Sequence, residues 1–400
     1  MRPLFITNTA RGGSNLVCQI LSANADVTVA SDPYLEVFRS MRNSLLLHAG
    51  YNGKFANKLN ETPFLHYYYD NEGKQIIDLI QNANCDVEIS EDEWKRIYEI
   101  QLRRLELECA ELIPLFHKTK SKTYNGMIYN LMEQIKTARS LPHQKWIGMK
   151  DPWIIELFFP LLRSFDDAKF IVVFRDPRAS IASNLLVQNK SMIAHVASFA
   201  RAWRKNVAFS LYLRQQEEFK NKLYFVSYEK LLSNPEDEVQ KICSFLEIKF
   251  SKSMLDTTNF IDYSTGKVWI GNSSYEEKTH GISPHRIDRW METLNVNAKS
   301  AIEYICGNEL RFIERKRSIN PKEPKLSSNA LEFFIEDNEG FKNWRTDSGF
   351  AEKEFGFEAA RNNLLSVNNS LIDKKTIKKF FLFEEVFEEL SYTDTDSLFG

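Results

Sequence analysis

The stretch Pro3-Leu-Phe-Ile-Thr-Asn-Thr-Ala-Arg-Gly-Gly-Ser-Asn-Leu-Val-Cys-Gln-Ile-Leu21 opens the chain and decides its fold. Residues 3–8 are mostly apolar and predict a short strand, and residues 9–13 hold two adjacent glycines and predict a tight turn. Residues 14–25 repeat apolar side chains at helical spacing. A strand, a glycine turn and a helix in this order are typical of the first unit of an α/β sheet.

The turn in this stretch has the composition of a phosphate cradle. Gly12 and Gly13 let the backbone bend sharply and approach a ligand closely, and Ser14 is placed to cap the helix. The N–H groups of the first helical turn favour an anion, and Arg11 adds a full positive charge beside them. An ordinary strand-to-helix turn is the alternative that this stretch alone leaves open.

A second stretch, Lys169-Phe-Ile-Val-Val-Phe-Arg-Asp-Pro-Arg-Ala-Ser-Ile-Ala-Ser-Asn184, favours the phosphate interpretation. Its continuous apolar run predicts a strand buried on both faces of a parallel sheet, and Asp176-Pro177 predicts a capped helix start. Arg175 is therefore expected at the carboxyl end of a strand, where open α/β sheets bind ligands, with Ser183 two helical turns further on. A guanidinium and a hydroxyl so placed suit a phosphate monoester.

Together the two stretches resemble the family of sulfotransferases that use 3′-phosphoadenosine 5′-phosphosulfate (PAPS) as donor. In that family a first loop holds the 5′-phosphosulfate, and an arginine followed after seven residues by a serine holds the 3′-phosphate. Arg175 and Ser183 match the second motif in type and spacing. Asn15 replaces the usual threonine or serine of the first loop. The resemblance assigns the 5′-phosphosulfate to Arg11, Gly12, Gly13, Ser14, Asn15 and Leu16.

Later motifs extend the likeness to about residues 1–45 and 145–315. Tyr228 matches the tyrosine that the family places against the adenine. The stretch Trp269-Ile-Gly-Asn-Ser-Ser-Tyr275 resembles the family's late nucleotide loop, which assigns Ser273 and Ser274 to the donor. Arg286-Ile-Asp-Arg-Trp290 resembles the helix after that loop but lacks the Arg-Lys-Gly of cytosolic members. The third contact to the 3′-phosphate therefore stays open.

The catalytic candidates come from a likeness to tyrosylprotein sulfotransferases and, more loosely, to bacterial members. Lys150, in Lys-Asp-Pro, matches a lysine that contacts the sulfuryl group. Asp32 falls where those enzymes place a catalytic glutamate, and it is assigned as the general base, although Asp-Pro also opens many turns. Glu36, His117 and His143 are the competing bases.

The composition of the chain limits the kinds of partner and cofactor that we expect. The net charge is only −2, with 52 basic and 54 acidic residues, which gives no general field for nucleic acid. The five cysteines are scattered without zinc-ligand spacing and predict reduced, mostly buried thiols. The first strand leaves no room for a signal peptide, and no apolar run of about 18 residues could span a bilayer. The expectation is a cytoplasmic protein without a metal cofactor or membrane span. A homodimer is possible.

The expected fold is α/β, with a parallel central sheet flanked by helices. Residues 1–317 are assigned to the sulfotransferase domain, in which residues 51–144 form a helical insertion between the first and second strands of the sheet. Residues 318–328, with two prolines among charges, are expected to be a linker, and residues 329–400 a helical extension. Within that extension, residues 374–390 predict one amphipathic helix.

The resemblance implies sulfuryl transfer from PAPS to a hydroxyl or amine of an unidentified acceptor, a small molecule, glycan or peptide. Arg11 and Lys150 would neutralise the charge that develops in a loose transition state. A P-loop kinase or NTPase is the enzymatic alternative, but Arg11 lacks the following lysine of the Gly-x-x-x-x-Gly-Lys-Ser/Thr motif. A nucleotide-binding module without catalysis is the third possibility.

Overall fold

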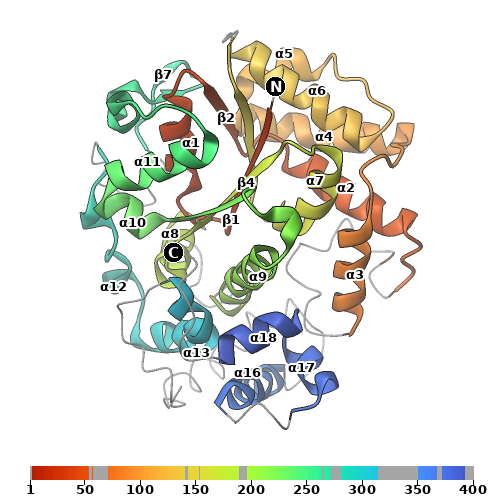
Figure 1. Cartoon of the computed structure of the whole chain (residues 1–400), viewed down its shortest axis with the longest axis vertical. Helices are drawn as coiled ribbons and strands as arrows, with labels where there is room; N and C mark the ends of the chain where they lie inside the picture. Colours follow the sequence, from red (N-terminus) through yellow and green to blue (C-terminus); the bar gives the residue numbers. More distant parts are fainter. Residues whose placement is uncertain are drawn as a thin grey trace.

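A five-stranded parallel sheet forms the centre of the protein (Figure 1), as the computed structural model shows. The structure describes residues 2–53, 56, 71–139, 143–152, 154–188, 196–263, 265–271, 281–313, 350–366 and 372–391. In spatial order the strands are β2 (Val27–Ser31), β3 (Trp146–Lys150), β1 (Arg2–Asn8), β4 (Lys169–Phe174) and β5 (Leu223–Ser227). The predicted α/β fold class is confirmed.

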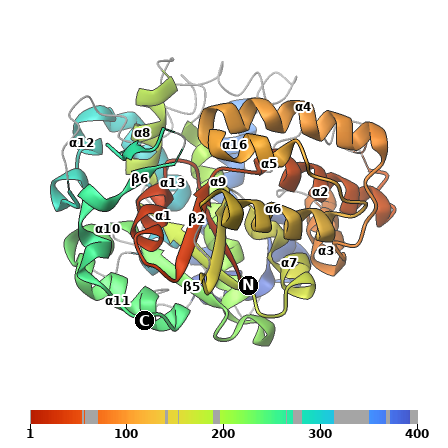
Figure 2. The same cartoon turned by 90° about the horizontal axis from the view of Figure 1, so that it is seen from above.

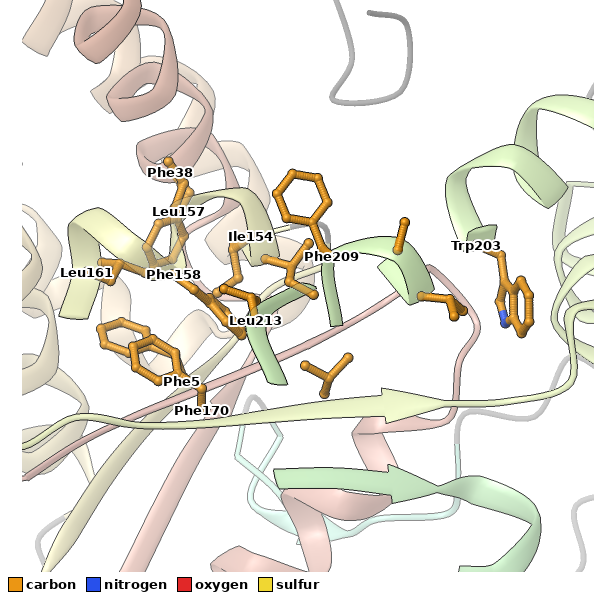
Figure 3. Packing of buried hydrophobic residues seen from close by; sticks show 14 of the residues in the cluster. Phe5, Phe38, Ile154, Leu157, Phe158, Leu161, Phe170, Trp203, Phe209 and Leu213 are labelled. Atoms are coloured by element: carbon orange, nitrogen blue, oxygen red, sulfur yellow. The ribbon is translucent and has the colours of Figure 1, made fainter. Parts of the chain in front are cut away.

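Successive side chains of the inner strands enter two different cores, because side chains alternate across a strand. On one face Phe5 stacks on Phe170 with ring centroids 5.6 Å apart, and Phe158 packs 4.5 Å from Phe170 (Figure 3). On the other face Leu4 and Ile171 join a second cluster. Both faces are covered, which explains why the strand sequences are continuously apolar rather than alternating.

Helices cover each face of the sheet (Figures 1 and 2). One face carries α1 (Ser14–Ser22), α10 (Tyr228–Ser233) and α11 (Pro235–Leu246). The other carries α2 (Leu35–His48), α3 (Asn71–Asn82), α6 (Tyr124–Ala138), α7 (Phe158–Ser164) and α9 (Val196–Arg214). The remaining helices of the main body are α4 (Glu91–Glu108), α5 (Ile113–Phe116), α8 (Pro177–Gln188), α12 (Trp290–Thr293) and α13 (Val296–Ile313). None of the helices in the described ranges is long and apolar enough to cross a membrane.

The helical insertion follows the second strand along the chain, not the first. The segment 27–31 pairs with β3 in parallel register and is itself a strand of the sheet, so α3 to α6 lie between β2 and β3. The prediction of an insertion between the first and second strands is wrong, because residues 27–31 form a further strand of the sheet ahead of the insertion. The domain boundaries stay predictions, and the linker 318–328 lies outside the described residues.

The C-terminal segment packs on the main body through α16 (Phe350–Ser366), α17 (Lys374–Phe380) and α18 (Glu384–Ser391) (Figure 1). The prediction of one helix over 374–390 is wrong. Phe381, Leu382 and Phe383 are all buried, and three consecutive side chains cannot share one face of a helix. The chain breaks there instead, which lets Phe383 stack on Tyr212 of α9 with ring centroids 4.0 Å apart.

Candidate active site

The carboxyl ends of all five strands meet at one edge of the sheet, and a cleft of about 280 Å³ lies there. Each strand end contributes a part of the wall: the first loop after β1, the turn after β2, the last residue of β3, and the residues that follow β4 and β5. The lining residues are Asn8, Ala10, Arg11, Gly13, Ser14, Asn15, Leu16, Asp32, Arg104, Glu108, Lys150, Pro152, Arg175, Ser183, Tyr228, Trp269 and Arg289. Parallel topology brings the strand ends together, and packing of other segments against this edge adds the rest of the wall.

The first loop has the backbone of an anion cradle. Arg11 and Gly13 have positive φ angles of 63° and 84°, and α1 begins at Ser14. The first N–H groups of a helix have no carbonyl partner within it, so those of Gly13 and Ser14, which line the cleft, suit an anion. Glycine is required at position 13 for two reasons: its φ is positive, and a Cβ there would lie 2.2 Å from the ring of Tyr228. Ser14 makes no capping hydrogen bond, so its predicted capping role is wrong: Gly13 occupies the cap position.

Arg11 joins the two phosphate motifs. Its Nε donates to Ser183 Oγ at 3.1 Å, and Arg175 Nη1 donates to the Arg11 carbonyl oxygen at 3.1 Å. Burial and the nearby Arg175 charge lower the pKa of Arg11. The Arg175 guanidinium lies 4.9 Å from the centroid of the Tyr228 ring, and Trp203 Nε1 donates to the Arg175 carbonyl oxygen at 2.8 Å. Arg11 and Arg175 therefore bring two positive charges to the same part of the cleft, which favours the binding of an anion there.

Lys150 and Asp32 form an ion pair beside the cradle, in which the lysine is buried and the carboxylate is partly exposed. Lys150 Nζ donates to Asp32 Oδ2, and the Asp32 backbone N–H donates to the Lys150 carbonyl oxygen at 2.6 Å. Burial alone would lower the pKa of Lys150, but the Asp32 carboxylate outweighs it and raises the pKa. Ser31 Oγ links the same turn to Asn15 Oδ1 at 3.0 Å. The asparagine that departs from the family's usual first loop therefore ties the cradle to the Asp32 turn.

Most of the predicted site residues lie in the cleft. Those that line it are Arg11, Gly13, Ser14, Asn15, Leu16, Asp32, Lys150, Arg175, Ser183 and Tyr228. Gly12 does not line the cleft, and its N–H donates to Thr9 O at 2.9 Å; the N–H of Leu16, which does line it, donates to Gly13 O at 3.2 Å. Ser273 and Ser274 lie outside the described residues.

The competing bases do not line the cleft. Glu36 is buried in ion pairs with Arg39 and Arg96, with N–O distances of 3.4 and 2.7 Å. His117 Nδ1 hydrogen-bonds the Tyr98 hydroxyl at 2.5 Å, and His143 is exposed. These positions leave Asp32 as the predicted base that the structure brings to the cleft.

Seven lining residues were not assigned from the sequence: Asn8, Ala10, Arg104, Glu108, Pro152, Trp269 and Arg289. Trp269 and Arg289 belong to the late motifs, so the likeness to those motifs was the available signal. Arg104 and Glu108 lie one turn apart near the end of α4, where nothing in the local pattern separates them from a solvated helix face. The described lining has five basic and two acidic side chains, which suits a multiply charged anion.

The chain matches the family described as "Sulfotransferase family" over residues 3–252. It belongs to the sulfotransferase family. The family recognised from the sequence motifs is thus confirmed.

Relatives of this chain include the Danio rerio protein named "Protein-tyrosine sulfotransferase 1", 29% identical over 154 residues that cover 38% of this chain and 40% of that protein. The Drosophila melanogaster protein-tyrosine sulfotransferase is 28% identical over 121 residues, 29% of this chain and 24% of that protein. The chain thus spans less than half the length of the curated relatives it matches.

Solved structures similar to this chain include sulfotransferase domains from a Synechococcus olefin synthase and from the curacin biosynthetic pathway. Their TM-scores are 0.44 and 0.43, at 18% and 16% identity. The similarity covers 74% and 77% of this chain, and 89% and 97% of those chains.

Proposed function

We propose that this sulfotransferase transfers the sulfuryl group of PAPS to a hydroxyl or amine of an acceptor. The observation that carries the proposal is the convergence of the Arg11 loop, Lys150 and Arg175 on one cleft from three separate strand ends. Each contributes a positive charge, and the glycine turn lets the backbone approach the anion. Family membership supports the same reaction.

The donor's two phosphate ends are assigned to different residues. Gly13, Ser14 and Asn15 would hold the 5′-phosphosulfate through backbone N–H groups at the start of α1. Arg175 and Ser183 would hold the 3′-phosphate, and Tyr228 would lie against the adenine. Arg289, which lines the cleft just before Trp290, is the candidate for the third 3′-phosphate contact that the sequence left open.

Arg11 and Lys150 would act on the reacting group. Sulfuryl transfer passes through a loose transition state by analogy with phosphoryl transfer, so the protein contributes positioning and charge stabilisation. Lys150 is held by Asp32 in the ion pair described above, and an incoming anion would compete for its ammonium group. Asp32, which the sequence assigns as the general base, lines the cleft with its carboxylate bound by Lys150, and Glu108 is the other carboxylate in the described lining; comparing Asp32→Asn with Glu108→Gln decides which of them takes the acceptor's proton.

The acceptor is the part of the proposal that the site residues leave most open. Two relatives carry the name protein-tyrosine sulfotransferase, which makes the hydroxyl of a tyrosyl peptide the first acceptor to test. A panel of tyrosyl peptides, phenols, sugars and amines incubated with 35S-labelled PAPS would identify it. If label is transferred neither to any of these acceptors nor to water, the proposed reaction is contradicted.

Calorimetric titration separates the proposal from a P-loop kinase. The desulfated product 3′-phosphoadenosine 5′-phosphate (PAP) should bind much more tightly than ATP with magnesium, because Arg175 and Ser183 are assigned to a phosphate that ATP lacks. Tighter binding of magnesium ATP would refute the sulfotransferase proposal. Binding of PAP without any transfer would support the alternative of a non-catalytic nucleotide-binding module.

Three further expectations belong to the proposal. A cytoplasmic location is supported by five buried cysteines that form no disulfide, and fractionation of cells expressing a tagged chain tests it. Catalysis without a metal predicts that EDTA leaves turnover unchanged. A homodimer is possible, and light scattering of the purified chain tests it.

A further inference from the structure

The end of α4 is held against the turn that carries Asp32. Cys109 Sγ donates to the Ser31 carbonyl oxygen at 3.3 Å, directly after the last residue of the helix. About two helical turns before the end of α4, Gln101 Nε2 donates to the Pro33 carbonyl oxygen, and Gln101 Oε1 accepts from the Glu36 N–H at 3.2 Å. These contacts fix the C-terminal turn of α4, which comes from the insertion, at the cleft that Asp32 and Lys150 line.

This turn brings a second carboxylate to the cleft. Glu108 is the last residue of α4, lines the cleft with Asp32 and Lys150, and remains accessible to solvent. Within the described part of the chain its carboxylate has no hydrogen bond or ion pair, whereas Asp32 is bound by Lys150. A glutamate in the last turn of a helix is disfavoured by the helix dipole, so helix stability does not explain it.

The charges around Glu108 suit a proton acceptor. Burial and the Asp32 carboxylate raise its pKa, while Lys150, Arg104 and Arg11 act in the opposite direction. A raised pKa makes the carboxylate a stronger base, closer to neutral pH, and two neighbouring carboxylates in different environments commonly divide their roles. Asp32 is engaged in holding the lysine, which leaves Glu108 to meet the acceptor.

We propose that Glu108 is the general base of this sulfotransferase and that Asp32 is a positioning residue for Lys150. This inference rests on the proposed function. In the step, a Glu108 carboxylate oxygen takes the proton of the acceptor hydroxyl as the acceptor oxygen forms its bond to sulfur. The bond between sulfur and the bridging oxygen of the 5′-phosphate breaks, and its electron pair stays on that phosphate as PAP departs. Lys150 and Arg11 offset the charge that develops there.

The test compares Glu108→Gln with Asp32→Asn, and uses Glu106→Gln as the matched control. Glu106 lies in the same helical turn, is exposed and does not line the cleft. Turnover is measured from pH 5 to 9 with 35S-labelled PAPS, using N-acetyltyrosinamide and, separately, water as acceptor. PAP affinity is measured by calorimetry. Carboxyl 13C NMR follows the titration of Glu108, whose signal is assigned by its absence in Glu108→Gln.

Glu108→Gln should lower turnover by about 10²–10⁴-fold, remove the fall in turnover at acid pH, and leave the dissociation constant for PAP within about twofold. Glu108→Asp should restore part of the turnover, and Glu106→Gln should match the wild type. Asp32→Asn should keep the acid fall but move it to lower pH, because removing a like charge lowers the pKa of Glu108. The NMR titration should move in the same direction.

The inference is overturned if Glu108→Gln keeps near-normal turnover with the acid fall intact, or if it loses PAP affinity as much as turnover. It is equally overturned if Asp32→Asn, and not Glu108→Gln, removes the acid fall. A wild-type protein that fails to bind PAP would instead refute the proposed function. The measurement of PAP binding therefore distinguishes a failure of the Glu108 inference from a failure of the proposed function.

Discussion

Gly13→Ala is the most informative single change in the donor site, because two separate costs can be assigned to it. Gly13 has φ +84°, which an alanine adopts only at a cost of about 1–2 kcal/mol. Its new Cβ would lie 2.2 Å from Cδ2 of the Tyr228 ring, so the ring must move, and overpacking of this kind costs about 1–3 kcal/mol. The free energy of unfolding should therefore fall by about 2–5 kcal/mol.

Nucleotide binding should fall as well, since the displaced ring is the proposed adenine platform and the loop is the proposed phosphate cradle. Gly50→Ala is the matched control: Gly50 has φ +80°, and a Cβ there meets no atom within 4 Å. It should lose only the backbone cost of about 1–2 kcal/mol and keep PAP affinity. Chemical denaturation measures stability, and calorimetry with PAP measures affinity.

A double-mutant cycle isolates the contact with the ring. In a Tyr228→Ala background, Gly13→Ala should cost only the backbone strain, because the ring that opposes the new Cβ is absent. Equal costs for Gly13→Ala in both backgrounds would refute the steric part of the reasoning. Wild-type PAP affinity in the single variant would refute the assignment of this loop to the donor.

Three further variants test the charged groups. Arg175→Ala should weaken PAP binding by about 1.5–3 kcal/mol in calorimetry, the scale of a hydrogen bond to a charged group, and unchanged affinity would end the 3′-phosphate assignment. Lys150→Ala should lower turnover far more than PAP affinity, because a contact made mainly in the transition state changes turnover alone; the reverse pattern would make Lys150 an anion anchor. Glu358→Gln should lower the free energy of unfolding by about 3–5 kcal/mol, since it leaves buried Arg201 and Arg204 without their carboxylate. Burial would raise the pKa of Glu358, but Arg204 and Arg201 lower it to about 2. The contribution of Glu358 to the free energy of unfolding is therefore present above its ordinary pKa of 4.5 and is lost as the pH falls toward 2. An acid unfolding curve that the substitution leaves unchanged would contradict this.

The sequence by itself determined the class of the central sheet and most residues of the proposed donor site. A strand, a glycine turn and a helix are local patterns, and so are the apolar run and the helix start around Arg175. Parallel pairing then places the carboxyl ends of such strands at one edge, whatever the rest of the chain does. The predicted loop, Lys150, Arg175 and Tyr228 meet in the cleft for that reason.

Only the tertiary structure decided what packs against this edge. Glu108 reaches the cleft because Cys109 and Gln101 contact a turn about 70 residues earlier in the chain. The spacing of apolar residues within a helix does not indicate such a long-range contact. Glu36, one helical turn beyond the predicted base, is instead buried with two arginines. Likewise the apolar pattern of 374–390 predicted one helix, but burial of all three residues from Phe381 to Phe383 broke it. Local patterns fix which residues can share a face, whereas long-range packing selects the partner that the face meets.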